Sequence, residues 1–215
     1  MDVARIWRQL AVMAEMQDDH NRLVHPRWRQ QGHDYYRAVW VECAELLDHY
    51  GWKWWKQQEA DLEQVRLEII DIWHFGLSEL LRANQFDEKL AERLANALAR
   101  DDTVGFRAGV EDLALKSLAT QRFDLEAFVA VMRALPMTFD ELYRGYVAKN
   151  VLNAFRQEHG YQDGSYRKRW HDGREDNEHL VEIVASLDAD ADSFVVDLGA
   201  ALAARYALAT PAPGA

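Results

Sequence analysis

The sequence predicts an all-α protein, and three observations support this fold class. The four prolines stand at positions 26, 136, 211 and 213, so that none interrupts the long stretch from Arg27 to Leu135. Apolar residues recur three and four positions apart, the spacing that places them on one face of a helix. Alternating β-branched runs separated by hairpin turns, which are typical of β-strands, do not occur. We therefore expect a bundle of helices.

Composition limits the domain count and the partners. At 215 residues the chain suits a single domain, which we place at residues 1–209, followed by a small, disordered tail at residues 210–215. A net charge of −11 argues against nucleic acid or an anionic membrane as the main partner. No segment reads as a signal peptide or a membrane span, and the single cysteine lies within an apolar helical stripe. We expect a soluble, cytoplasmic protein.

The N-terminal half of the chain contains three predicted long helices. The first runs from about Val3 to Leu23 and is followed by the loop HPRWRQQGHD. Two more helices lie between Tyr35 and Leu81, joined by a loop rich in Trp and Lys. Asp61 and Gln64 have the spacing of a capping box at the start of the second of these helices.

Shorter helices are expected after this pair. Residues 84–135 contain the amphipathic segments KLAERLANALARDD, VEDLALKSLATQRF and LEAFVAVMRALP, which we interpret as cover helices or a dimer surface. Thr138 and Glu141 form a second capping-box candidate and open a long helix that reaches about His159. After a glycine-containing basic loop, the segments NEHLVEIVASL and DSFVVDLGAALAARYALA predict two final helices.

Two acidic pairs are the strongest candidates for a functional site. Glu42 and Glu45 lie three residues apart on one predicted helix, and Glu68 and Asp71 lie three apart on the next. Antiparallel packing of the two helices would bring four carboxylates together, where they repel one another unless a cation is present. Oxygen ligands favour Mg²⁺ or Mn²⁺. Acidic pairs at this spacing are common in a chain with 36 acidic residues, however, and most of them are solvated helix faces.

A cationic stripe follows the long helix near the C-terminus. Lys149, Asn153 and Arg156 align on one side of this helix, and the stripe continues into the basic loop. Arginine and lysine side by side suit phosphate oxygens. An ordinary solvated face accounts for the pattern equally well.

Polar amides and aromatic residues offer possible base contacts. Gln17 and Asn21 stand one turn apart, and paired amides can read the mixed donor and acceptor edge of a nucleobase. Phe75 shares a face with the second acidic pair, where its ring could stack on a base, although such a residue is more often core. Trp54 and its two neighbouring tryptophans are difficult to bury in a short loop and indicate an interface anchor or a lid over a ligand.

Taken together, four motifs resemble one known family. They are MQDDHN, ECAE followed by GWKWWK, EIIDIWHF, and KNVLNAFRQEHGYQDGSYRKRW. In this order and spacing the chain resembles the dimeric all-α dUTP diphosphatases, within the wider all-α nucleoside triphosphate pyrophosphatases. The resemblance covers most of residues 13–75 and 146–170, whereas residues 84–135 match only as generic helices.

The resemblance implies roles for residues at two kinds of position. The carboxylates that would hold Mg²⁺ are Glu42, Glu45, Glu68 and Asp71. One glutamate, Glu42 in preference to Glu45, would also help to deprotonate the attacking water. By the same resemblance, the phosphates would contact Lys149, Arg156 and Lys168, and the deoxyribose would contact Asn153 and Tyr161. The uracil would contact Gln17, Asn21 and Phe75, and Trp54 would help to close the site.

The implied activity is hydrolysis of dUTP, and commonly of dUDP, to dUMP by a homodimer. Two alternatives remain open at this point. One is a broader pyrophosphatase of the same fold that acts on dCTP or modified nucleotides. The other, from a different class, is a non-catalytic helical dimer with a regulatory binding role.

Overall fold

The computed structural model describes residues 2–102, 104–189, 191 and 193–209 of the chain. Across these residues the backbone forms nine α-helices and one short 3-10 helix, and no strand. The predicted all-α fold class is therefore confirmed. The predicted disordered tail at residues 210–215 lies outside the described residues.

The chain divides into two compact units, Met1–Tyr143 and Arg144–Ala215. Helix α7 (Phe139–Glu158) contributes its first residues to one unit and the rest to the other. None of the described helices is long and apolar enough to cross a bilayer. The assignment of residues 1–209 to one domain stays a prediction.

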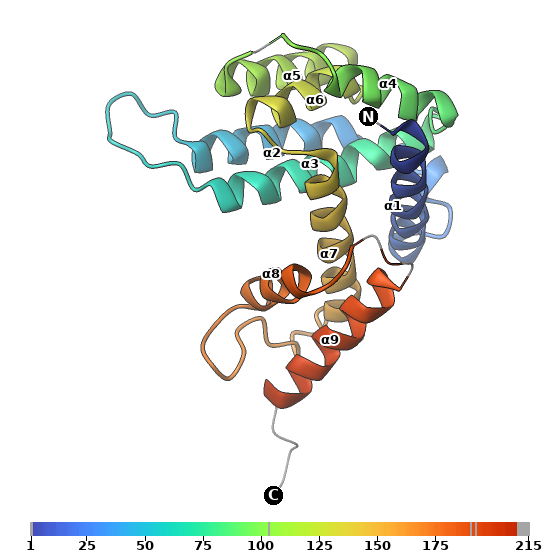
Figure 1. The fold of residues 1–215 in the computed structure, drawn as a ribbon, viewed down its shortest axis with the longest axis vertical. Helices are drawn as coiled ribbons and strands as arrows, with labels where there is room; N and C mark the ends of the chain where they lie inside the picture. Colours follow the sequence, from blue (N-terminus) through green and yellow to red (C-terminus); the bar gives the residue numbers. More distant parts are fainter. Residues whose placement is uncertain (1, 103, 190, 192, 210–215) are drawn as a thin grey trace, which may run out of the picture. The chain divides into compact units, whose positions relative to one another are not determined.

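A helical hairpin lies at the centre of the first unit. It consists of α2 (Tyr35–Tyr50) and α3 (Leu62–Arg82), which lie side by side and run antiparallel, joined by the loop drawn in cyan in Figure 1. Helix α2 buries a stripe of three residues at a spacing of four and three, namely Val39, Cys43 and Leu46. The buried face of α3 is broader and includes Val65, Ile69, Ile72, Trp73, Leu77 and Leu80. The predicted pair of helices is confirmed.

The loop between these helices is held at both ends. Gly51 ends α2 with φ 86°, a conformation that a side chain would strain, and its N–H donates to Leu47. At the other end the Asp61 carboxylate accepts from the backbone N–H of Gln64 at 3.2 Å and caps α3. The backbone N–H of Asp61 also donates to the carbonyl of His49 at 3.0 Å. The predicted start of α3 is confirmed, and the loop begins and ends at fixed points.

The first unit contains four further helices. They are α1 (Val3–Val24), α4 (Glu88–Leu98), α5 (Phe106–Thr120) and α6 (Leu125–Ala134). Helix α5 packs against α2, and α1 packs against α3 and α4. The Trp73 ring of α3 stacks on Phe128 of α6 with centroids 5.4 Å apart. The segment 25–34, predicted as a plain loop, contains a 3-10 turn (Trp28–Gln30) because the buried Trp28 indole donates to Asp18 at 2.9 Å.

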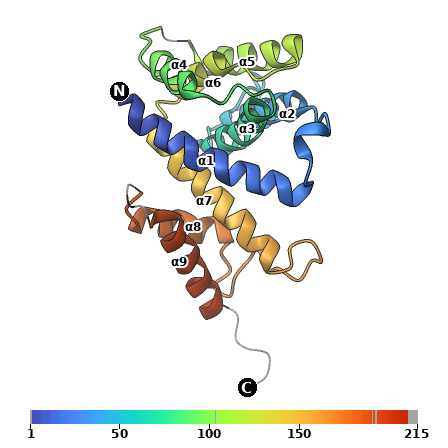
Figure 2. The ribbon, with the colours of Figure 1, turned by 90° about the vertical axis from the view of Figure 1, so that its right-hand side faces the viewer.

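The second unit contains most of α7 together with α8 (Asp176–Ser186) and α9 (Phe194–Ala209), which lie beside it in Figure 2. The predicted capping box opens α7, since Thr138 accepts from the N–H of Glu141 at 3.1 Å and Glu141 accepts from the N–H of Thr138 at 2.7 Å. The core of this unit includes Val147, Leu152, Phe155, Leu180, Phe194, Leu198 and Leu202. Aromatic rings from α9 and from the loop between α7 and α8 complete this core, with the ring centroids of Tyr166 and Tyr206 stacked 5.5 Å apart.

Candidate active site

The hairpin brings three of the predicted carboxylates together. One oxygen from each of Glu42, Glu68 and Asp71 lies within 4.8 Å of the others. Glu68 is buried, at 8% exposed, and the other two are half-buried. Each residue lies next to the apolar stripe of its helix, so packing of α2 on α3 places their oxygens at the hairpin's seam. Three hard oxygen donors at this separation suit a divalent cation.

Glu45 is set apart from this acidic trio of Glu42, Glu68 and Asp71. It lies one turn from Glu42 on α2 and its side chain is exposed. Its negative charge still acts on Glu42 and Glu68 and raises the pKa of both. The role of Glu45 as a metal ligand stays a prediction.

Electrostatics in the trio favour a proton or a cation. Burial, then the hydrogen bond with Glu68, raise the pKa of Glu42 to about 8. Burial also raises the pKa of Glu68, and the charge of Asp71 acts on both glutamates in the same direction. His49 Nε2 lies 3.6 Å from Glu68 Oε1, where a protonated imidazole would offset part of this charge. A divalent cation would take the place of the proton that the raised pKa favours on Glu42.

The predicted base-reading amides form an internal hydrogen-bond chain. Gln17 is 3% and Asn21 7% exposed, and Gln17 Nε2 donates to Asn21 Oδ1 at 3.1 Å. Gln17 Oε1 contacts His74 Nδ1 at 2.8 Å, and Asn21 Nδ2 donates to Ser78 Oγ at 2.9 Å. The Ser78 hydroxyl donates in turn to the carbonyl of His74 at 2.9 Å. These hydrogen bonds fix the orientation of both side-chain amides, because the oxygen and the NH₂ group of each have a defined partner. Recognition of uracil by Gln17 and Asn21 stays a prediction.

Sequence reasoning missed His74 and Ser78 as partners of these amides. Both pairs are spaced by four, which places each pair on one face of its helix. In the sequence, only this spacing could have indicated that the two pairs contact each other. It becomes informative once α1 is known to pack on α3.

The predicted aromatic residues differ in exposure. Phe75 is half-buried on α3, one turn after Asp71. Trp54 is 89% exposed in the loop between α2 and α3 and makes an edge contact with Trp55, with ring centroids 5.5 Å apart. The loop that carries it is ordered by Gln58, whose Oε1 accepts from the backbone N–H groups of Trp52 and Lys53 at 3.1 and 2.8 Å. Both residues are accessible in the first unit, and their contacts with a nucleotide stay predictions.

The cationic stripe lies in the second unit and is less uniform than predicted. Lys149 and Asn153 are half-buried on α7, whereas Tyr161 and Lys168 are exposed in the loop, with Lys168 Nζ 5.3 Å from the Tyr161 ring centroid. Arg156 differs from the others because it is buried and paired, through Nε and Nη2, with both oxygens of Asp176 at 2.8 Å. The phosphate and sugar contacts assigned to this stripe stay predictions.

Comparison with known families decides the assignment. A family model described as dUTPase matches residues 9–161 of the chain. The chain belongs to the all-α dUTPase family. The match covers the acidic trio, the amide pair and the stripe as far as Tyr161, and it leaves Lys168 outside. A comparison with curated proteins returns no match.

Membership of the dUTPase family makes the chain a dUTP diphosphatase, a hydrolase of nucleotide metabolism with a nucleotide substrate. This confirms the enzyme class that the motifs predicted. Enzymes of this family generally depend on divalent metal, and the acidic trio is a possible site for it.

Proposed function

We propose that this dUTPase uses Mg²⁺, or Mn²⁺ in its place, to hydrolyse dUTP and also dUDP to dUMP, releasing pyrophosphate or phosphate. The observation that carries the proposal is the acidic trio on the seam of the α2–α3 hairpin. Its oxygens are hard ligands, and their mutual repulsion is relieved when a cation binds. Mg²⁺ held by few carboxylates retains positions for water and phosphate oxygens.

The proposed mechanism assigns distinct tasks to the carboxylates. A bound Mg²⁺ would neutralise charge on the phosphate oxygens and lower the pKa of a coordinated water. Glu68 and Asp71, together with Glu42 and Glu45, would hold it. Glu42, in preference to Glu45, would also accept the proton of the attacking water.

The nucleotide contacts in the proposal follow the residues already described. Lys149, Arg156 and Lys168 would neutralise the phosphates, and Asn153 and Tyr161 would contact the deoxyribose. Uracil would contact the amides of Gln17 and Asn21, which the hydrogen bonds between α1 and α3 orient. Phe75 would stack on the uracil ring, and Trp54 would close over it. A cytoplasmic homodimer remains part of the proposal.

A substrate panel tests the activity. Purified protein is assayed with dUTP, dUDP, dTTP, dCTP and UTP, with and without Mg²⁺, and the released pyrophosphate or phosphate is measured. We expect turnover of dUTP and dUDP that EDTA abolishes. Faster turnover of dCTP would favour the broader pyrophosphatase, and no turnover of any nucleotide would favour the non-catalytic dimer.

Substitutions in the trio test the metal site. Glu42→Gln and Asp71→Asn keep side-chain size and remove charge, so we expect loss of turnover by at least about 100-fold with unchanged helix content. Glu92→Gln is the matched control, because Glu92 is an exposed residue of α4. Near-normal hydrolysis by either trio variant would contradict the metal assignment.

A further inference from the structure

A fully buried carboxylate in the second unit joins three segments of the chain. Asp176 begins α8 and is 0% exposed. Its Oδ2 accepts from Arg156 Nε of α7 and from the Tyr166 hydroxyl of the preceding loop, both at 2.8 Å. Its Oδ1 accepts from Arg156 Nη2, also at 2.8 Å. One side chain therefore connects α7, the loop and α8.

This arrangement fixes the orientation of the Arg156 guanidinium. Two parallel N–H···O bonds to one carboxylate set both the plane and the direction of the group. A buried charge of this kind is tolerated only when it is paired, so neither partner can turn away at low cost. The Nη1 edge remains on the side of Asn153, whose Oδ1 accepts from it at 3.3 Å. Of the two Nη1 hydrogens, one has no acceptor within the part of the chain that the structure describes.

Asp176 also holds the loop that carries Lys168. The backbone N–H of Asp176 donates to the carbonyl of Lys168 at 2.8 Å. Tyr166, two residues before Lys168, is buried and donates its hydroxyl to the same aspartate. Burial and the neighbouring carboxylate raise the pKa of this hydroxyl above its ordinary value. The position of Lys168 is thus set by the same residue that orients Arg156, through the backbone N–H of Asp176 and through the bond of its side chain to Tyr166.

We propose that Asp176 is a positioning residue for dUTP hydrolysis. It holds Arg156 with its Nη1 edge available, and holds the Lys168 loop, in the arrangement that receives the phosphate oxygens of the substrate. It does not contact the substrate. The inference rests on the phosphate-binding role proposed above for Arg156 and Lys168.

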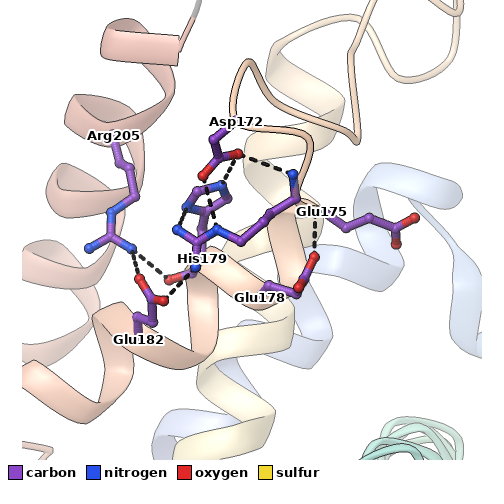
Figure 3. A network of polar contacts seen from close by, with 7 residues as sticks. Asp172, Glu175, Glu178, His179, Glu182 and Arg205 are labelled. Carbon is purple, nitrogen blue, oxygen red and sulfur yellow. Dashed lines mark hydrogen bonds and ion pairs between the residues drawn. The ribbon is translucent and has the colours of Figure 1, made fainter.

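The same helix supplies a matched control. In a second polar network, at the surface, Glu182 accepts from Arg174 Nη1 at 2.5 Å and from Arg205 Nη1 at 2.8 Å. Figure 3 shows Glu182 and Arg205 of this network. In the same view Asp172 accepts from the buried His179 Nε2 at 3.2 Å. Glu182→Gln removes two ion pairs from α8 but leaves the bonds of Arg156 intact. It separates general loss of stability from loss of orientation.

The test compares substrate with a ligand that lacks phosphate. For the full chain with Mg²⁺, kcat and KM are measured with dUTP, and deoxyuridine is used as a competitive inhibitor. We expect Asp176→Asn to lower kcat/KM about 10-fold to 100-fold, mainly through KM, because small misplacements of a binding group cost rate on this scale. The inhibition constant of deoxyuridine should stay within about twofold, and Glu182→Gln should leave both quantities within about twofold of the wild type.

A double-mutant cycle and a milder variant complete the design. With Arg156 already replaced, Asp176→Asn should cost less than it does in the wild type, because only its hold on the Lys168 loop remains to be lost. If Asp176→Asn does not fold, Tyr166→Phe decides, since it removes one bond to Asp176 and leaves the ion pair. It should raise KM for dUTP several-fold without changing deoxyuridine inhibition.

Several results would overturn the inference. One is an unchanged or lowered KM for dUTP in Asp176→Asn or, where that variant does not fold, in Tyr166→Phe. A second is that the losses of the Arg156 and Asp176 substitutions add in the double-mutant cycle. A third is that the variant loses deoxyuridine binding as strongly as it loses dUTP binding. A wild-type chain that leaves dUTP intact would overturn the proposed function and this inference together. Wild-type turnover with an unaffected Asp176→Asn would overturn this inference alone.

Discussion

Replacing Glu42 with glutamine should make the metal-free enzyme more stable at alkaline pH. The substitution keeps the size of the side chain and removes the charge that burial and Glu68 oppose. Since the pKa of Glu42 is raised from 4.5 to about 8, the full effect is at most about 5 kcal/mol, at about 1.4 kcal/mol per pH unit. Glu42 is only half-buried, so water screens the charge and we expect about 1 to 2 kcal/mol.

The sign follows from proton binding. Between pH 4.5 and about 8 the folded chain holds a proton on Glu42 that the unfolded chain has released, so the free energy of unfolding falls as pH rises. Below this window both states are protonated and the cost is absent. Glu42→Gln should therefore match the wild type near pH 4.5 and exceed it by about 1 to 2 kcal/mol at about pH 9.

Urea unfolding in EDTA, followed by tryptophan fluorescence at several pH values, measures this difference. The control is Glu92→Gln, an exposed position where we expect less than about 0.5 kcal/mol at every pH. Saturating Mg²⁺ should raise the free energy of unfolding of the wild type and raise that of Glu42→Gln much less, because the variant lacks one of the proposed carboxylate ligands. An equal effect of the substitution at pH 4.5 and pH 9, or a destabilised variant at pH 9, would refute the electrostatic reasoning.

Three further substitutions test the scaffold around the site. Gly76→Ala should destabilise the first unit by about 1 to 3 kcal/mol in urea unfolding, because the added Cβ would lie 2.6 Å from the Phe123 ring; an unchanged midpoint would contradict this packing. Thr138→Ala should cost about 0.5 to 2 kcal/mol by removing the acceptor that caps Glu141, and Thr138→Ser should restore most of it. Gln58→Ala should speed amide exchange in residues 51–61 without lowering global stability by more than about 1 kcal/mol, since its carbonyl holds two N–H groups of the loop; exchange at the wild-type rate would show that the loop is ordered by other contacts.

Much of the fold could be predicted because its signals are local. The stripe of Val39, Cys43 and Leu46 repeats at helical spacing, and the structure buries all three. The caps at Asp61 and Thr138 depend on residues three positions away, so the sequence alone locates them. Prediction failed in detail where a helix depends on a distant partner, as with the turn around Trp28 that bonds to Asp18.

The same difference between local and distant contacts decides which residues of the candidate site could be predicted. Glu68 and Asp71 were found because three-residue spacing puts them on one face, and packing of two consecutive helices then adds Glu42. The spacing gave Glu45 equal weight, although the structure leaves it exposed and outside the trio. Whether a carboxylate lies at the seam or one turn beyond it depends on the rotation of α2 against α3, which spacing within one helix does not determine.

Arg156 illustrates a difference that the sequence could not reveal. Its place in a row with Lys149 and Asn153 suggested an exposed cation, yet it is buried against Asp176, twenty residues further along the chain. A lysine at an exposed position acts on phosphate as a mobile point charge, whereas a guanidinium fixed by a carboxylate acts from one direction. Substitution of Lys168, which is exposed, should therefore weaken dUTP binding in proportion to the lost charge. Salt should reduce this loss of affinity, because it screens exposed charges. Arg156→Lys should lose most of the phosphate binding proposed for Arg156 although the charge is kept, because an ammonium group cannot make the two parallel bonds to Asp176.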